Sequence, residues 1–234
     1  MLKIKQRPLL CLLAILFVLA EIAMGIYVQT GTEQINIVAY CSVALAFVFV
    51  LYCFDKSYLW LFTAAALMMT LCADVFLVLL TPRREVLAMV FFNLAQVFYA
   101  LRLFCKQKTA RHQTVHLLLR VVLCAAALVA TKLVLKENTN LLALISIVYY
   151  ANLICNVVWA FIVKDTMFAV GLIFFALCDA FVGLGVLCNM LNVSQTSLLY
   201  KLAFPAKVDP VWLFYVPSQT LIALSTLPNK LKSN

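Results

Sequence analysis

Charged residues are scarce in this 234-residue chain: they make up 12% of it, while 66% of its residues are hydrophobic and the mean hydropathy is +1.07. Soluble domains are about 45–50% apolar and about 25% charged, so a water-soluble core could not bury this much apolar surface. Glycine and proline are also scarce, with 5 and 6 residues, which leaves little room for linkers or a second domain. The composition predicts one multi-span membrane domain over residues 1–234.

Several chemical motifs are missing as well. The chain has no G-x-S-x-G elbow, no HExxH motif, no P-loop and no dinucleotide fingerprint. Its nine cysteines form no CxxC pair, and we interpret them as small buried hydrophobic residues. His112 and His116 lie beside a basic loop and are interpreted as solvated loop residues. We therefore expect no metal site and no cofactor.

The net charge of +9 does not indicate nucleic-acid binding, because no recognition motif accompanies it. The basic residues cluster in loops and tails beside apolar runs, where they set membrane topology and contact anionic lipid headgroups. The expected partners are membrane lipids, with no nucleic acid.

Apolar runs of about 20 residues, the length that an α-helix needs to cross a bilayer, occur eight times. The predicted spans are 8–29, 36–54, 58–81, 86–105, 115–135, 140–163, 166–188 and 211–228. We expect the first to be a retained helix rather than a signal peptide, because its apolar stretch continues past Glu21 and no A-x-A site follows. The fold class is an all-α bundle of transmembrane helices, with a short interfacial helix predicted within 194–204.

Eight spans put both termini on one side of the membrane. Two thirds of the 18 basic residues, Arg102 and Arg120 among them, fall on that side, so the positive-inside rule places the termini in the cytoplasm. The motif LCADVF of the third span returns as LCDAFV in the seventh, and QVFYALR of the fourth resembles QTLIALS of the eighth. These similarities indicate a possible parallel repeat of four plus four helices.

Two acidic residues, Asp74 and Asp179, lie within apolar runs, where a carboxylate has no water to solvate it. Ionisable groups in a bilayer cost about 2.5–3.5 kcal/mol each and normally face a cavity or a partner. Counting residues from the outer helix ends places both acids in one slab of the outer half of the membrane. No lysine or arginine is predicted at their level. Most other intramembrane polar residues fall in the same slab, so we expect one shared polar cavity.

The same polar residues could instead hold helices together, because amides and hydroxyls often do so in membranes. We favour that structural role for Ser42, Asn93, Ser146 and Asn156. For Asn152 and Gln219 the two interpretations are balanced, and Glu21 is either a third member of the site or a lipid-facing residue.

Two carboxyls that share an apolar site can hold one proton between them, giving an acid beside a carboxylate. Such a pair suits general acid–base hydrolysis and also suits proton-coupled transport. With Asn152, the two acids could in principle hold a hard cation.

Four stretches carry a resemblance to a known family. They are Ala73-Asp74, Asn93–Tyr99, the segment Gly171–Asp179 that ends in Leu-Cys-Asp, and Tyr215–Gln219. Together with the predicted spans, they resemble the YhhN-type lysoplasmalogenase family of multi-span membrane proteins. Gln96 stands where the family usually has His, Ala73 where it has Gly, and Cys178 where it has Ser. The second span also lacks a Lys-Pro that members often carry.

The resemblance implies hydrolysis of the vinyl-ether bond of lysoplasmalogens, giving a fatty aldehyde and a glycerophospho-alcohol. Asp74 and Asp179 would be the catalytic acid and base, in an order that is left open. The implied substrate-binding residues are Glu21, Asn93, Gln96, Tyr99, Asn152, Tyr215 and Gln219. Because glutamine cannot shuttle a proton at neutral pH, either the histidine is not the proton carrier or this chain has changed its substrate or lost activity.

The sequence therefore predicts an intramembrane hydrolase acting on a lysoplasmalogen-like lysophospholipid. The alternatives are a proton-coupled transporter and a non-catalytic lysolipid-binding membrane protein. The expected location is the cytoplasmic membrane if the chain is bacterial and the endoplasmic reticulum membrane if it is eukaryotic. The oligomeric state is left open.

Overall fold

The computed structural model describes residues 7–31, 33–107, 109–205 and 208–227, and it contains helices and no strands over these residues. The longer elements are α1 (Arg7–Thr30), α2 (Ile35–Tyr52), α3 (Tyr58–Asp74), α4 (Glu85–Lys106), α5 (Ala110–Leu135), α6 (Leu141–Ile162), α7 (Thr166–Met190) and α9 (Pro210–Leu224). The shorter ones are η2 (Val75–Leu79), η3 (Lys136–Asn138) and α8 (Leu198–Ala203). The all-α prediction is confirmed.

Seven of the described helices are long and apolar enough to cross a membrane. The eighth predicted span corresponds to α9, whose 15 residues are fewer than the roughly 20 that a bilayer-spanning helix needs. The chain leaves α9 in a turn at Ser225–Leu227, and residue 228, the predicted end of this span, lies outside the described residues. The structure therefore supports an integral membrane protein with seven clear spans and one shorter apolar helix.

Side-chain caps set where several helices begin. Ser57, Asn140 and Ser197 each accept a hydrogen bond from the backbone N–H three residues later, at the starts of α3, α6 and α8. Asp209 caps α9 in the same way through the N–H of Val211. Because the first turn of a helix leaves backbone donors without partners, these polar residues fix the helix starts between apolar runs.

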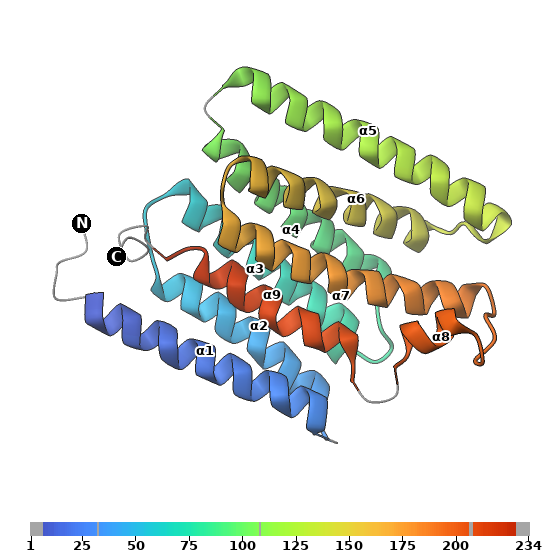
Figure 1. Cartoon of the computed structure of the whole chain (residues 1–234), viewed down its shortest axis with the longest axis horizontal. Coiled ribbons are helices and arrows are strands. Elements are labelled where there is room, and N and C mark those ends of the chain that lie inside the picture. Colours follow the sequence, from blue (N-terminus) through green and yellow to red (C-terminus); the bar gives the residue numbers. More distant parts are fainter. Residues whose placement is uncertain (1–6, 32, 108, 206–207, 228–234) are drawn as a thin grey trace.

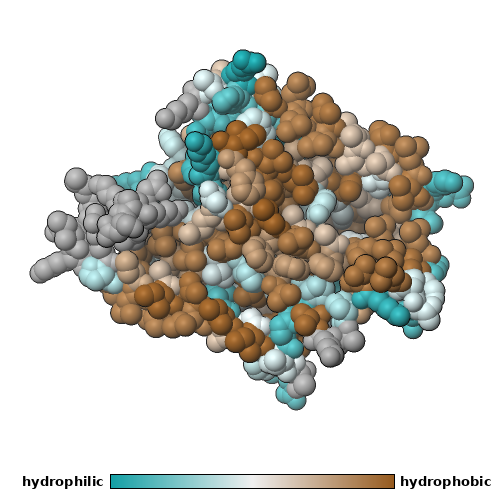
Figure 2. Space-filling model, in the orientation of Figure 1, coloured by the Kyte–Doolittle hydropathy of each residue, from teal (hydrophilic) through white to brown (hydrophobic). Residues whose placement is uncertain are grey.

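The helices lie roughly side by side, with α1 and α5 at opposite edges of the bundle (Figure 1). The first residues of α1 and the last residues of α9 lie at the same end of the bundle, which we call the N-terminal end. The termini themselves, 1–6 and 228–234, lie outside the described residues, so their cytoplasmic location stays a prediction. Figure 2 shows apolar side chains over most of one face, with hydrophilic side chains gathered mainly toward its ends.

Most packing pairs follow the pattern that a four-plus-four repeat would produce, although α1 also packs on α9 and the corresponding pair α5 and α4 makes no comparable contact. Helix α3 packs on α4 as α7 packs on α9, and α1 packs on α2 as α5 packs on α6. Likewise α2 contacts both α3 and α9, while α6 contacts both α7 and α4. This correspondence of neighbours fits the proposed parallel repeat, which stays a prediction until the two halves are superposed.

Helices α7 and α9 approach each other closely at Gly171. A Cβ atom at this position would lie 2.9 Å from the Ile222 side chain and 3.1 Å from its backbone nitrogen. Gly183, further along α7, would place a Cβ in open space. We expect Gly171→Ala to destabilise the protein by about 1–3 kcal/mol, because the added methyl overpacks the helix crossing.

The matched change Gly183→Ala should instead stabilise α7 by about 0.5–1 kcal/mol, because alanine loses less backbone entropy in a helix. Thermal unfolding of both variants in the same detergent provides the comparison. Equal melting temperatures for the two variants would contradict the close approach at Gly171.

Candidate functional site

Asp74 is the last residue of α3, at the point where the chain passes into the π-helical turn η2. Its side chain is 3% exposed, and the hydroxyl of Tyr215 on α9 donates a hydrogen bond of 2.6 Å to its Oδ2. Turns of π-helix within α-helices occur frequently at functional sites, because the wider turn re-aims neighbouring side chains. The structure therefore gives Asp74 one hydrogen-bond partner, Tyr215, in otherwise apolar surroundings.

Asp179 is half-buried on α7 and has a partner of the same kind. The hydroxyl of Tyr149 on α6 donates a hydrogen bond to its Oδ2. The sequence analysis did not single out Tyr149. The available signal was its spacing, because Tyr149 lies three residues before Asn152 and therefore on the same face of a helix.

Phe175 joins the two tyrosine–aspartate pairs. It lies one turn before Asp179 on α7, with its ring 5.6 Å from that of Tyr215 and 6.4 Å from that of Tyr149. We call Asp74, Tyr215, Phe175, Tyr149 and Asp179 the acid centre. It brings together side chains from α3, α6, α7 and α9.

Glu21 lies apart from the acid centre, between α1, α2 and α9. It is 2% exposed, and the hydroxyl of Ser42 donates a hydrogen bond of 2.5 Å to its Oε2. Glu21 also lines a groove of about 550 Å³ between α1 and α9, together with Gly25, Val216 and other residues of these two helices. Glu21 is thus neither a lipid-facing residue nor a direct partner of either aspartate.

Asn152 and Gln96 belong to a different group, around Arg120 of α5. Arg120 donates hydrogen bonds of 2.7 Å to Oδ1 of Asn152 and 2.6 Å to Oδ1 of Asn156. Asn156 in turn donates a bond of 2.9 Å to the side-chain oxygen of Gln96. By their hydrogen bonds, the polar residues divide into the acid centre, the Glu21 group and this group, which we call the Arg120 cluster, and the shared cavity stays a prediction. Each group fills a different helix contact.

The remaining candidates contact neither aspartate by a hydrogen bond. Asn93 donates to the carbonyl oxygens of Met89 and Ile145, so it links α4 to α6 as the structural interpretation expected. Gln219 donates to the neighbouring Ser218, and its side-chain oxygen is buried without a partner. The hydroxyl of Tyr99 is likewise buried without a partner.

His116 is not a solvated loop residue, which corrects the sequence interpretation. It lies on α5, is fully buried, and its ring stacks at 4.6 Å on Phe104 and 4.6 Å on Trp159. Nη2 of Arg120 lies 3.1 Å from its Nε2. The sequence could not reveal this, because His116 follows a polar first turn of α5 that resembles a loop. His112, four residues earlier, is exposed as expected.

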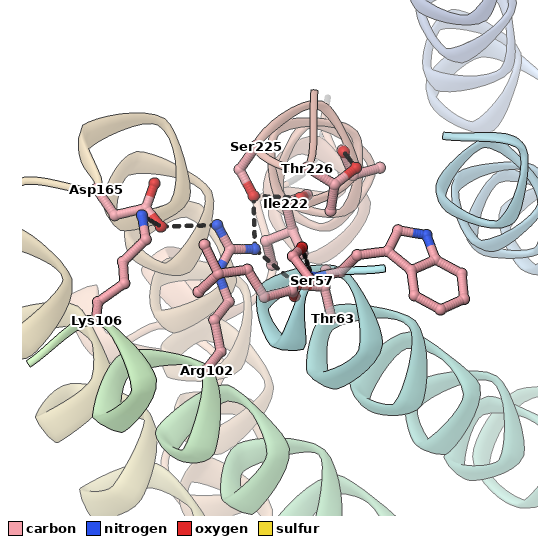
Figure 3. A network of polar contacts seen from close by, with 11 residues as sticks. Ser57, Thr63, Arg102, Lys106, Asp165, Ile222, Ser225 and Thr226 are labelled. Atoms are coloured by element: carbon pink, nitrogen blue, oxygen red, sulfur yellow. Dashed lines mark hydrogen bonds and ion pairs between the residues drawn. The ribbon is translucent and has the colours of Figure 1, made fainter. Parts of the chain in front are cut away.

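Arg102 is also buried, although the sequence analysis counted it among the basic residues of the inner side. Its side chain is 1% exposed at the N-terminal end of the bundle, and it donates to Asp165, Thr63 and Ser225 at 2.7–2.8 Å (Figure 3). Lys106 donates to the same Asp165 oxygen at 2.5 Å. This network ties α4, the α6–α7 turn, α3 and α9 together.

Burial raises the pKa of Asp165, but the charges of Arg102 and Lys106 outweigh burial and hold that pKa below its usual range. Asp165 is therefore a carboxylate at neutral pH, and this network is a compensated ion cluster. The charges of this network are paired with opposite charges, whereas the aspartates of the acid centre have only neutral tyrosine partners.

No three His, Cys, Asp or Glu side chains of the described residues come together as a metal-ligand set. Asp74 and Asp179 instead have tyrosine partners, and Asn152 has an arginine partner. What the acid centre offers chemically is two carboxyls oriented by phenol hydroxyls in an apolar surrounding.

The comparison with protein families agrees with this architecture. The model of the YhhN family matches residues 35–226, which include both aspartates and both of their tyrosine partners. No curated protein and no solved structure matches the chain. The matched region extends from the start of α2 to the turn after α9 and covers most of the sequence. The chain therefore belongs to the YhhN family.

Proposed function

We propose that this protein hydrolyses the vinyl-ether bond of lysoplasmalogen-like lysolipids within the membrane. Membership of the YhhN family suggests this activity. The observation that supports it best is the acid centre, in which Asp74 and Asp179 each accept a hydrogen bond from a tyrosine and both tyrosine rings pack against Phe175. Two carboxyls near each other are what acid–base cleavage of this bond requires.

The reaction adds one water molecule across the vinyl ether. The protonated carboxyl delivers its proton to the alkene carbon that is not bonded to the ether oxygen, and the adjacent carbon and the oxygen become an oxocarbenium ion. The second carboxyl, as a carboxylate, stabilises that cation and takes a proton from the water that attacks it. As the resulting hemiacetal breaks its bond to the glycerol oxygen, the second carboxyl returns its proton to that oxygen and the first takes the proton of the hemiacetal hydroxyl, so the glycerol leaves as an alcohol and both carboxyls regain their starting states. The other product is a fatty aldehyde.

The tyrosines orient the carboxyls in this scheme. Each phenol hydroxyl bonds Oδ2 of its aspartate, which leaves Oδ1 for the transferred proton or the attacking water. A phenol also stabilises a neighbouring carboxylate without adding a permanent positive charge. The tyrosines thus fix the direction of each carboxyl, and the two carboxyls differ in protonation because a pair in one apolar site can share a single proton.

Gln96 is compatible with the proposal although relatives usually have histidine at this point. Its side-chain oxygen accepts from Asn156 in the Arg120 cluster, and it makes no hydrogen bond to either aspartate. The two carboxyls can supply both proton transfers themselves. The reaction therefore needs no proton shuttle at residue 96.

The proposed location follows from the chemistry of the substrate, which is itself a membrane lipid. The chain is an integral membrane protein with seven clear apolar spans. The cytoplasmic membrane of a bacterium, or the endoplasmic reticulum membrane of a eukaryotic cell, is the proposed location.

Release of fatty aldehyde by the purified protein in detergent micelles tests the proposed function. With a lysoplasmalogen, we expect aldehyde and glycerophospho-alcohol in equal amounts. The 1-alkyl lysophospholipid with the same headgroup should release nothing, because it lacks the double bond that accepts the proton.

The absence of aldehyde release from lysoplasmalogens with several headgroups would contradict the hydrolase proposal. Binding of the 1-alkyl analogue in that case would favour the non-catalytic lysolipid-binding alternative. Proton movement driven by lipid addition in proteoliposomes would favour the transporter.

A further inference from the structure

Arg120 is a cation far inside a membrane-spanning helix. It lies ten residues, or about 15 Å, from the start of α5 and is half-buried against α6. Helix α5 is at the edge of the bundle (Figure 1). It packs mainly on α6 and contributes only two buried side chains, His116 and Leu135. The polar groups that this helix turns toward the protein are therefore gathered at one level.

No carboxylate compensates this charge. All nine acidic residues of the chain are among the described residues, and the ion pairs there are those that Asp165 makes with Arg102 and Lys106. An arginine in a protein stays protonated, and an unpaired charge within a bilayer is expensive. The neutral amides of Asn152 and Asn156 orient the guanidinium but do not neutralise it.

Among the groups around Arg120, more hydrogen-bond donors than acceptors are left unused. The side-chain oxygens of Asn152 and Asn156 accept from Arg120, and that of Gln96 accepts from Asn156. In contrast, Nε of Arg120, Nε2 of Gln96 and Nε1 of Trp159 are buried donors that find no partner among the described residues, against one such acceptor, Oε1 of Gln107 beside His116. Gln96 is fully buried and Trp159 is 3% exposed. An excess of donors around a fixed positive charge is the chemistry of an anion site.

Helix α6 connects this cluster to the acid centre. Tyr149, the partner of Asp179, precedes Asn152 by three residues, so the two side chains share one face and lie about 4.5 Å apart along the helix axis. Asn156 continues the same face one turn further on. In a lysoplasmalogen, the glycerol backbone likewise holds the phosphorus only a few bonds from the vinyl-ether oxygen.

We propose that the Arg120 cluster binds the phosphodiester of the substrate lysolipid, while the acid centre faces its vinyl ether. The N–H groups that Arg120 does not use on Asn152 and Asn156, its buried Nε–H among them, can donate charge-assisted hydrogen bonds to phosphate oxygens, and the free donors of Gln96 and Trp159 add further bonds. This assignment rests on the proposed function for the identity of the lipid. It gives Gln96 a role as a donor to phosphate rather than as a replacement for a catalytic histidine.

The kinetic test compares two substrates, a lysoplasmalogen and the 1-alkenylglycerol that lacks the phosphate. Arg120→Gln should lower kcat/KM for the lysoplasmalogen by about 10- to 100-fold, through KM, because it removes charge-assisted hydrogen bonds. The same variant should cleave 1-alkenylglycerol as the parent does. Lys132→Gln removes one charge from an exposed position of the same helix and should leave both substrates unchanged.

Arg120→Lys keeps the charge but loses the planar guanidinium. It replaces Arg120→Gln in this test if that variant does not fold. It should also impair only the phosphate-bearing substrate, by a smaller factor. An equal loss on both substrates, in variants that elute and melt like the parent, would overturn the phosphate site and leave Arg120 as an anchor for α5.

Binding supplies a readout that does not need turnover. The chain has three tryptophans, so a Trp60→Phe/Trp212→Phe background leaves Trp159 as the reporter beside His116. The non-cleavable 1-alkyl lysophospholipid should change its fluorescence saturably, and Arg120→Gln in this background should abolish the change. Glycerophosphocholine and inorganic phosphate should act only at much higher concentration, because they lack the apolar chain.

The outcomes separate the two proposals. Arg120-dependent binding without any aldehyde release would support the phosphate site and contradict the hydrolase. Aldehyde release with no Arg120-dependent binding would support the hydrolase and overturn the phosphate site. Inorganic phosphate acting as strongly as the lipid would overturn the assignment to a lipid headgroup.

Discussion

Asp74→Asn and Asp179→Asn are each expected to lower the rate of aldehyde release by about 10²- to 10⁴-fold, the usual contribution of one general acid or base. Asparagine keeps the shape and can still accept a hydrogen bond from Tyr215 or Tyr149, but it can neither deliver nor take a proton at neutral pH. The double variant should be only slightly slower than the slower of the two single variants, because the effects of mutating residues that act as one unit are not additive.

Asp55→Asn is the matched control for this experiment. Asp55 is exposed in the turn between α2 and α3, and the same change there should leave the rate unaltered. Each variant is first compared with the parent by size-exclusion elution and melting temperature in the same detergent. Full activity of either folded site variant would remove that aspartate from the mechanism while leaving the family assignment intact.

Asp165→Asn is expected to destabilise the protein by about 3–5 kcal/mol, because it leaves the buried cation of Arg102 without its counter-charge. Arg102 is 1% exposed, lies 3.9 Å above the ring of Phe168 and cannot move to solvent without leaving Thr63 and Ser225. Lys106 loses its partner at the same time. The melting temperature in detergent measures the effect, again with Asp55→Asn as the exposed control.

The pH dependence of the parent protein's stability tests whether the ion pairs of Asp165 cause this stabilisation. The pKa of Asp165 is lower in the folded protein than its ordinary value, because Arg102 and Lys106 outweigh the effect of burial. Its stabilising contribution is therefore complete above the unfolded value of about 3.9 and is lost as the pH falls through the lower folded value. The parent should lose stability on acidification below about pH 4, and Asp165→Asn should lose less over that window. Identical pH profiles would show that the ion cluster does not stabilise the fold.

The membrane class, the approximate span boundaries and the family could all be obtained from the sequence. Hydropathy depends on composition summed along a stretch of chain, so it locates an apolar helix such as α6 to within a residue or two. Asp74 and Asp179 could be singled out for the same reason, because a charge stands out in an apolar run wherever the helix faces. The sequence thus identified the two acids but not their partners.

The partners depend on helix rotation and on which helices are neighbours. In a membrane bundle, the lipid-facing and protein-facing sides of a helix are both apolar, so the sequence gives little indication of which side packs inward. This is why Tyr149 was overlooked, and why the Arg120 cluster was not separated from the acid centre. Depth along the helix can be counted from the sequence, but direction around it cannot.

The sequence by itself determined that this is an apolar helical chain of the YhhN family with two acids inside its spans. Only the tertiary structure decided that Asp74 and Asp179 each meet a tyrosine, that Arg120 turns inward to Asn152 and Asn156 beside His116, and that Arg102 is buried on Asp165. The physical reason is that burial of a polar group in lipid requires a partner, and the partner is supplied by a different helix, often distant in the sequence.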